Sequence, residues 1–132
     1  MDFTLTEERR MLQDSLRRTL ERAAEADGAA LWQRLADLGA GAALLPEEAG
    51  GFGGTGTDIA LVAAEVGRAG AVVPMIDAVI LGAGILAAAG GHEALVTRLA
   101  EGGARAALAD GEPGARYDPV TNTRARKSGT GW

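Results

Sequence analysis

The glycines between Gly51 and Gly56 are the first candidate for chemistry, because they read Gly-Phe-Gly-Gly-Thr-Gly and fit the G-x-G-x-x-G pattern of dinucleotide-binding loops. In such loops a strand comes directly before the glycines, and a pyrophosphate sits at the start of the following helix. Here two helical segments come first, and Glu47 and Glu48 would repel a pyrophosphate. Asp77 has about the spacing of a ribose-binding acid but lies in an apolar helical run. We therefore interpret the glycines as a connection that turns sharply between helices.

Scarce reactive residues exclude several other kinds of site. The chain has no cysteine, and His92 is the only histidine, so thiol nucleophiles, cysteine-ligated zinc and multi-histidine metal sites are excluded. Lys127 is the only lysine and follows no phosphate-binding glycine loop. Ser15 and Ser128, the only serines, lie far from His92 in sequence, which disfavours a Ser–His–Asp triad. We predict no metal site and assign no catalytic residue.

Composition indicates one globular domain rather than a disordered chain. Of 132 residues, 47% are hydrophobic and 23% are charged. The net charge of −5 argues against a nucleic-acid partner, which would favour a basic face. No basic stretch followed by an apolar one opens the sequence, so we expect a cytoplasmic protein.

Hydrophobic periodicity predicts five helices. The first is amphipathic, with leucines recurring every four residues, and Thr4 or Thr6 is expected to cap it. Thr57 is expected to cap the third, and Pro74 suits the first turn of the fourth. The expected ranges are about 4–25, 31–38, 58–70, 72–91 and 93–101.

The fourth helix is expected to be central and buried. Between Met75 and Ala89 its only charge is Asp77, and the run is too short to span a bilayer, which takes about 20 apolar residues. Gly82 and Gly84 lower helix propensity, so we expect them to allow close approach of a neighbouring helix or a ligand.

After Gly103 the pattern changes. Residues 104–110 and 121–127 are each expected to form a short strand, with a turn-rich stretch between them. Because two strands alone are marginally stable, such a pair would need a partner layer.

The stretch LPEEAGGFGG at 45–54, with the helix after it, matches the pattern L-P-E-E-x-G-G-x-G. Further matching stretches are MDFTLTEERRMLQDSLRRTLER at the start, LWQRLADLGAGAAL before the loop, and ALADGEPGARYDP and TRARKSGTGW near the end. Together with LPEEAGGFGG, they show that the sequence resembles the acyl-CoA dehydrogenase family over essentially the whole chain. The opening and VVPMIDAVILGAGILAAAG look like branches described as small subunits of pimeloyl-CoA or steroid-side-chain dehydrogenases.

This resemblance implies a mainly α fold: a five- to six-helix N-terminal domain at 1–103, and at 104–132 the start of a middle β domain with one or two short strands. Family members bind FAD and oxidise an acyl-CoA to the α,β-enoyl-CoA. A glutamate removes the α-proton while a hydride passes to the flavin. That base usually lies in a C-terminal domain, so none of the acids in this chain is assigned its role.

The resemblance also points to two groups of ligand contacts. A strand and a TEPGAGSD-like turn, here residues 111–118, contact the flavin and the acyl-CoA in the family. The implied flavin contacts are Leu108, Asp110 and Gly111, and the implied substrate contacts there are Arg116 and Tyr117. The start of the fourth helix lines the acyl pocket, which adds Val73, Pro74, Asp77, Ala78 and Leu81. Plain core packing for this second group, and a simple turn for the first, stay open as alternatives.

Three hypotheses follow. The chain is the N-terminal part of an FAD-dependent acyl-CoA dehydrogenase, inactive alone and assembled into a homo- or hetero-oligomer with dehydrogenase subunits. Alternatively it is a non-catalytic partner subunit, because Gly111, Arg116 and Tyr117 replace the Thr, Gly and Ser of the family turn. The third hypothesis is a stand-alone helical interaction module.

Overall fold

A computed structural model of the chain describes residues 4–21, 27–109, 111 and 123–131. Five α-helices, one π-helical segment and two single turns of 3₁₀ helix make up the described part, so the mainly α fold predicted from sequence is confirmed. The elements in chain order are α1 (Glu7–Glu21), α2 (Gly28–Asp37), η1 (Ala42–Leu44), η2 (Glu47–Ala49), α3 (Gly56–Arg68), η3 (Met75–Ala83), α4 (Gly84–Ala89) and α5 (Glu93–Ala100).

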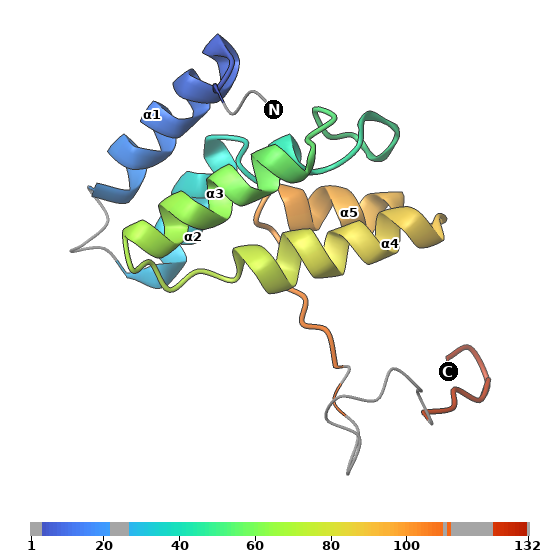
Figure 1. Ribbon diagram of the computed structural model, residues 1–132. Coiled ribbons are helices and arrows are strands. Elements are labelled where there is room, and N and C mark those ends of the chain that lie inside the picture. Colours follow the sequence, from blue (N-terminus) through green and yellow to red (C-terminus); the bar gives the residue numbers. More distant parts are fainter. Residues whose placement is uncertain (1–3, 22–26, 110, 112–122, 132) are drawn as a thin grey trace.

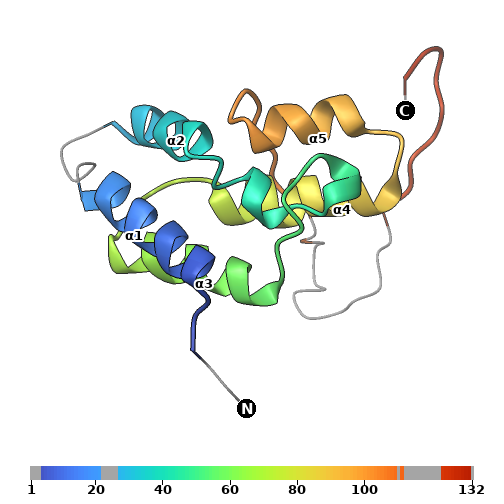
Figure 2. The ribbon, with the colours of Figure 1, turned by 90° about the horizontal axis from the view of Figure 1, so that it is seen from above.

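The helices form two packed groups (Figures 1 and 2). At one end α1 packs on α3 and α2, and at the other α5 packs along η3 and α4. Contacts of α3 with η1 and η3 join the two groups. The chain leaves the bundle below η3 in the view of Figure 1.

Local hydrogen bonds fix the helix starts. Thr6 caps α1, since its hydroxyl accepts from the Arg9 backbone N–H at 3.4 Å. Thr55, not Thr57, caps α3 through a capping box in which the Thr55 N–H donates to Asp58 at 2.8 Å. The expectation for Thr57 was wrong because only Thr55 has an acid three residues further on.

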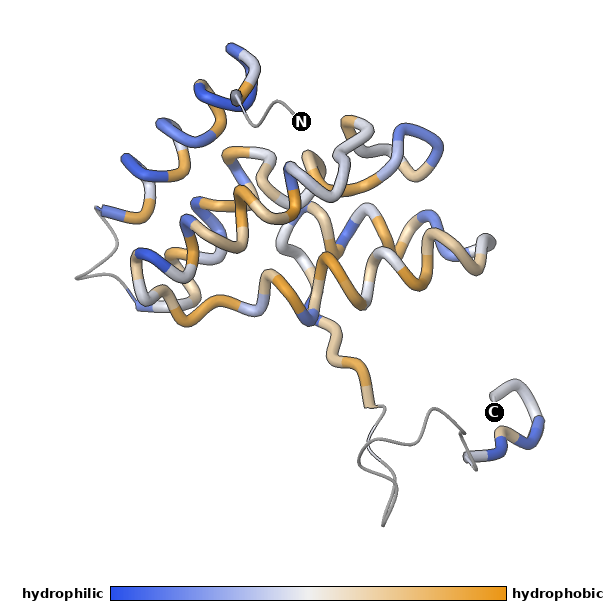
Figure 3. Tube along the Cα trace, viewed as in Figure 1, coloured by the Kyte–Doolittle hydropathy of each residue, from blue (hydrophilic) through white to orange (hydrophobic). Residues whose placement is uncertain are grey.

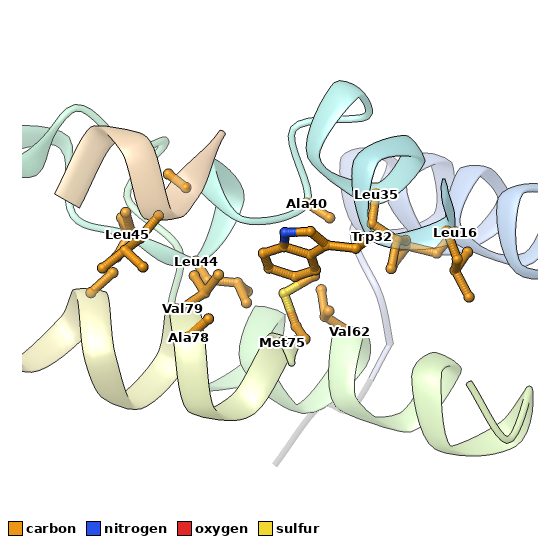
Figure 4. Packing of buried hydrophobic residues seen from close by; sticks show 14 of the residues in the cluster. Leu16, Trp32, Leu35, Ala40, Leu44, Leu45, Val62, Met75, Ala78 and Val79 are labelled. Atoms are coloured by element: carbon orange, nitrogen blue, oxygen red, sulfur yellow. The ribbon is translucent and has the colours of Figure 1, made fainter. Parts of the chain in front are cut away.

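A single hydrophobic core joins both groups (Figure 4). Trp32 lies near its middle with Met75 beside it, and the indole N–H donates to the Gly102 carbonyl oxygen at 3.1 Å. That bond ties α2 to the point where the chain leaves α5. The largest side chains in the core that are fully shielded from solvent are Leu16, Leu35, Leu45, Val62, Met75, Val79, Val96 and Leu99.

Ion pairs connect α1 to α3. Arg9 Nε donates to Asp58 Oδ1 at 2.8 Å, and this hydrogen bond holds the pKa of Asp58 well below its ordinary value. Glu65 is 2% exposed, although it sits on a surface helix. Its carboxylate accepts from Gln13 at 2.7 Å and from Arg68 at 2.7 Å, and Arg17 Nη2 lies 2.9 Å away. All ionised oxygens of Glu65 are therefore satisfied where they are buried.

The predicted fourth helix forms, but its first part winds as a π-helix before α4 continues it. Met75, Ala78, Val79 and Ala83 face the core, which matches the expected central position. Ile76 and Ile85 nevertheless remain about half exposed, at 53% and 49%. The hydrophobic colouring of Figure 3 runs along this segment. Within the described ranges, no helix is long and apolar enough to cross a membrane.

The two short strands expected after Gly103 are not found in the part that the structure describes. Residues 104–109 and 123–127 form no ladder, and the single β-type contact given for the described residues is a bridge between Ser128 and Gly131. A strand needs a neighbour to take up its backbone hydrogen bonds, and neither stretch has one among the residues that the structure describes. Ala104 and Ala106 pack instead against the helical core.

Candidate functional site

The glycine-rich loop uses its backbone donors internally. The N–H groups of Gly51, Phe52 and Gly53 donate to the carbonyl oxygens of Pro46, Ala42 and Leu45 at 3.0, 2.9 and 3.0 Å. These donors are therefore unavailable to a phosphate, which needs free backbone N–H groups. The loop acts as a connection, as the sequence indicated.

Two further features of the loop explain its glycines. Gly50 and Gly53 have φ of 80° and 74°, a conformation that favours glycine. A Cβ on Gly54 would overlap the Ala43 carbonyl oxygen, and one on Gly51 would overlap that of Leu45. The glycines therefore serve tight turns and close packing.

The residues expected to line an acyl pocket lie at different depths around the start of η3. Ala78 is fully buried in the core, while Val73, Pro74 and Leu81 are half-buried. Asp77 is exposed, and its carboxylate has no hydrogen-bond or ion-pair partner among the described residues. Core packing accounts for Ala78, whereas Asp77 is accessible and the half-buried members keep part of their surface accessible.

The expected flavin contacts are only partly described. Leu108 is 44% exposed and Gly111 is exposed, and a Cβ on Gly111 would meet no atom within 4 Å. Asp110, Arg116 and Tyr117 lie outside the described residues.

The segment that leads to the expected flavin contacts crosses η3, which carries part of the expected acyl group. The segment 104–109, which leads to Leu108, passes over η3 at Gly82, where the Ala106 Cβ would lie 2.7 Å from a Cβ on that glycine. Gly82 is five residues after Asp77 on the same π-helical segment. The contact at Gly82 and Ala106 therefore lies between Asp77 and Leu108 along the chain path, although neither of these two residues takes part in it.

A separate pocket of about 270 Å³ opens between η2, α4 and the turn before α5. Glu48, His92 and Glu93 are among its lining residues, and none of the predicted site residues is. Backbone hydrogen bonds, including one from the Gly91 N–H at 3.1 Å, hold the pKa of Glu93 below its ordinary value. No group of three or more side chains that could hold a metal ion occurs in the described ranges. Nothing in the sequence indicated the pocket, because its walls come from three separate segments.

The sequence profile of the family described as "Acyl-CoA dehydrogenase, N-terminal domain" matches residues 6–102. The chain belongs to the acyl-CoA dehydrogenase family. It is 40% identical over 79 residues to acyl-CoA dehydrogenase IpdE2 of Mycobacterium tuberculosis (strain ATCC 25618 / H37Rv). That alignment covers 59% of this chain and 25% of the relative, so the matched part spans about a quarter of the relative's length. No solved structure matches the chain.

Members of the acyl-CoA dehydrogenase family generally depend on FAD, and the described residues of this chain do not enclose a flavin by themselves. Leu108 and Gly111 are exposed, with open space around Gly111. Ligand sites normally bury most of the bound molecule, so further walls would have to come from outside these residues. The described residues would therefore supply only one side of a flavin site.

Proposed function

We propose that the chain forms the N-terminal helical part of an FAD-dependent acyl-CoA dehydrogenase, which converts an acyl-CoA thioester to its α,β-enoyl form. The family match over 6–102 carries this proposal. The helical domain would extend over 1–103, and residues 104–132 would begin a middle domain. The acyl-CoA, the flavin and further dehydrogenase subunits are the proposed partners, and a cytoplasmic location is part of the same proposal.

In this assembly η3 would form one wall of the acyl pocket. Leu81 is half-buried, as are Val73 and Pro74, and would offer the exposed part of its apolar surface to the acyl chain. Asp77 is exposed on the same segment and is available to a polar group of the ligand or of a neighbouring subunit. Leu108, Asp110 and Gly111 would contact the flavin, and Arg116 and Tyr117 the acyl-CoA.

A pair of variants tests the acyl wall in the native assembly. Leu81→Trp should lower kcat/KM for long acyl chains by about tenfold or more, because one lost apolar contact or a filled pocket costs roughly 1–3 kcal/mol. Short acyl chains should be affected less. Met11→Trp places the same bulk on an exposed position of α1 and serves as the control. Equal losses for both variants, or for all chain lengths, would contradict a pocket wall at Leu81.

Because the catalytic base of the family usually lies in a C-terminal domain, we expect the purified 132-residue chain to show no acyl-CoA oxidation. The assay would use added FAD, an artificial electron acceptor, and straight-chain, branched and steroid-derived acyl-CoA substrates. Turnover by this chain alone would refute the expectation.

A second candidate is a non-catalytic subunit of a heteromeric dehydrogenase. The replacement of the family's Thr by Gly111 favours it, since a hydroxyl donor to the cofactor is lost. The intact mass of the native product separates the candidates. A chain much heavier than 13.4 kDa points to one longer dehydrogenase, whereas a 13.4 kDa product that purifies with a complete dehydrogenase points to a partner subunit.

A further inference from the structure

Gly82 lies at a crossing of two segments. The chain at 104–106 runs over η3, and a Cβ placed on Gly82 would lie 2.7 Å from the Ala106 Cβ. It would also lie 3.0 Å from the Asp77 carbonyl oxygen, one π-helical turn earlier. Gly82 therefore contacts both the backbone of an expected acyl residue and the segment that leads to the expected flavin contacts.

The atom that a Cβ on Gly82 would meet is the Ala106 Cβ, which cannot move away by a change of side-chain rotamer. A Cβ is fixed to its backbone, so relief of a 2.7 Å contact requires the chain at Ala106 to shift. Gly84, two residues on, is different, because a Cβ there would lie 3.9 Å from its nearest neighbour, the Val79 carbonyl oxygen. Helix propensity alone favours alanine at either position, so it does not explain glycine at Gly82.

The geometry points to Gly82 as a positioning residue: its missing side chain seats the segment 104–109 on η3 and so sets where Leu108 and Gly111 emerge beside the acyl wall. The packing part of this assignment rests on the contacts alone. Its consequence for cofactor binding rests on the proposed function.

Cleavage after Arg105 reports whether the chain at 104–106 stays packed on η3. Arg105 is exposed and lies between Ala104 and Ala106, which are half-buried against the core. Trypsin needs an extended segment, so cutting after Arg105 reports how often this stretch lifts off η3. Gly82→Ala in the 132-residue chain should speed this cut about tenfold or more. Cutting after Arg124 and Arg126, which are exposed and far along the chain, should not change.

Two further variants make the test specific. Gly84→Ala should leave the cut after Arg105 at the wild-type rate. Gly82→Ala combined with Ala106→Gly removes the clashing partner and should restore protection, which a general loss of stability would not do. Equal cutting in wild type and Gly82→Ala would overturn the assignment. So would a double variant that stays unprotected, or that fails to fold.

FAD retention in the native assembly provides the second readout. Gly82→Ala should lower the flavin content of the purified assembly, and the added Ala106→Gly change should recover it. If the tryptic pattern responds as expected but no variant or wild-type assembly holds FAD, the positioning role stands and the proposed function fails. If FAD content is unchanged while the cut after Arg105 accelerates, the link between seating and cofactor binding is refuted.

Discussion

Glu65 is a buried carboxylate whose position the sequence alone did not reveal. Its neighbours along α3 are mostly apolar, but Gln13 and Arg17 reach it from α1 and Arg68 from its own helix. Led by the hydrogen bond from Arg17, these donors lower the pKa of Glu65 from 4.5 to about 2. A group whose pKa is depressed by folding contributes stability above its unfolded pKa and loses it as the pH falls.

The free energy of unfolding should therefore fall between pH 4.5 and about 2, as Glu65 takes up a proton. At pH 7 Glu65→Gln should lower it by roughly 2–3 kcal/mol, and the gap to wild type should close toward pH 2. Urea unfolding at a series of pH values measures both.

Glu48→Gln, at an exposed position on η2, is the control and should change little. A Glu65→Gln chain with an undiminished pH dependence below 4.5 would show that another acid carries the effect.

Thr55 and Thr57, on either side of the first residue of α3, give a prediction about which of them caps the helix. Thr55→Ala should lower the free energy of unfolding by about 1 kcal/mol, because the Thr55 side chain accepts from the Asp58 backbone N–H and also from Arg9 Nη2 at 2.9 Å. Thr57→Ala should change it by less than about 0.5 kcal/mol, since Thr57 lies inside the helix on an exposed face. Thermal unfolding followed by circular dichroism compares the two. A larger effect at Thr57 would favour Thr57 as the cap after all.

At the level of elements, the loop between α2 and α3 depends on glycines that pack rather than bind. Gly54→Ala should lower the free energy of unfolding by at least about 2 kcal/mol, because the new Cβ overlaps the Ala43 carbonyl oxygen. Gly56→Ala, at the first position of α3 with open space around it, should be neutral or slightly stabilising. Chemical denaturation of both variants checks this. Similar tolerance at both positions would mean that the loop can shift freely.

The presence of the helices was predictable from the spacing at which apolar residues recur along the sequence. All five predicted helical segments form. The π winding of η3 was not predictable, since a run that is apolar on nearly every side has no polar face to mark its period. The strands at 104–110 and 121–127 were expected from local alternation. Local pattern does not supply a pairing partner, and Ala104 and Ala106 pack against the helical core instead.

At the scale of the whole molecule, several apolar side chains have no cover within the described chain. Val72 is 90% exposed, and Ile76, Ile85 and Leu108 are all above 40%. Ile76 lies on η3 and Ile85 on α4, while Val72 comes just before η3 and Leu108 comes after α5. Isolated exposed apolar residues are ordinary, but several on neighbouring segments are what the proposed assembly with other subunits would bury.

The isolated chain should therefore bind the dye ANS and associate with itself as concentration rises. The double variant Ile76→Ser with Ile85→Ser should reduce both effects, as measured by dye fluorescence and light scattering after size exclusion. Met11→Ser, a 65% exposed position on α1, is the matched control and should leave them unchanged. A monodisperse wild-type chain that binds no dye would favour the stand-alone module.

The candidate site was the part least accessible to sequence reasoning. The family resemblance named residues near the start of the fourth helix and after Gly103. Which of these side chains a ligand can contact depends on how deeply each is buried in the core. Ala78 is buried and Asp77 is exposed although they are neighbours. The role of Gly82 depends on a crossing between segments more than 20 residues apart, which no local pattern encodes.

The hydrogen bond from the Trp32 indole to the Gly102 carbonyl oxygen gives the molecule a built-in optical probe. Indole emission responds to its polar neighbours, and Trp32 is 3% exposed while its partner lies just before the segment that crosses η3. With Trp132 replaced by Phe, Trp32 would be the sole tryptophan of the chain. Its emission could then follow, in real time and without a label, the docking of the chain end onto the bundle as a cofactor or a partner subunit binds.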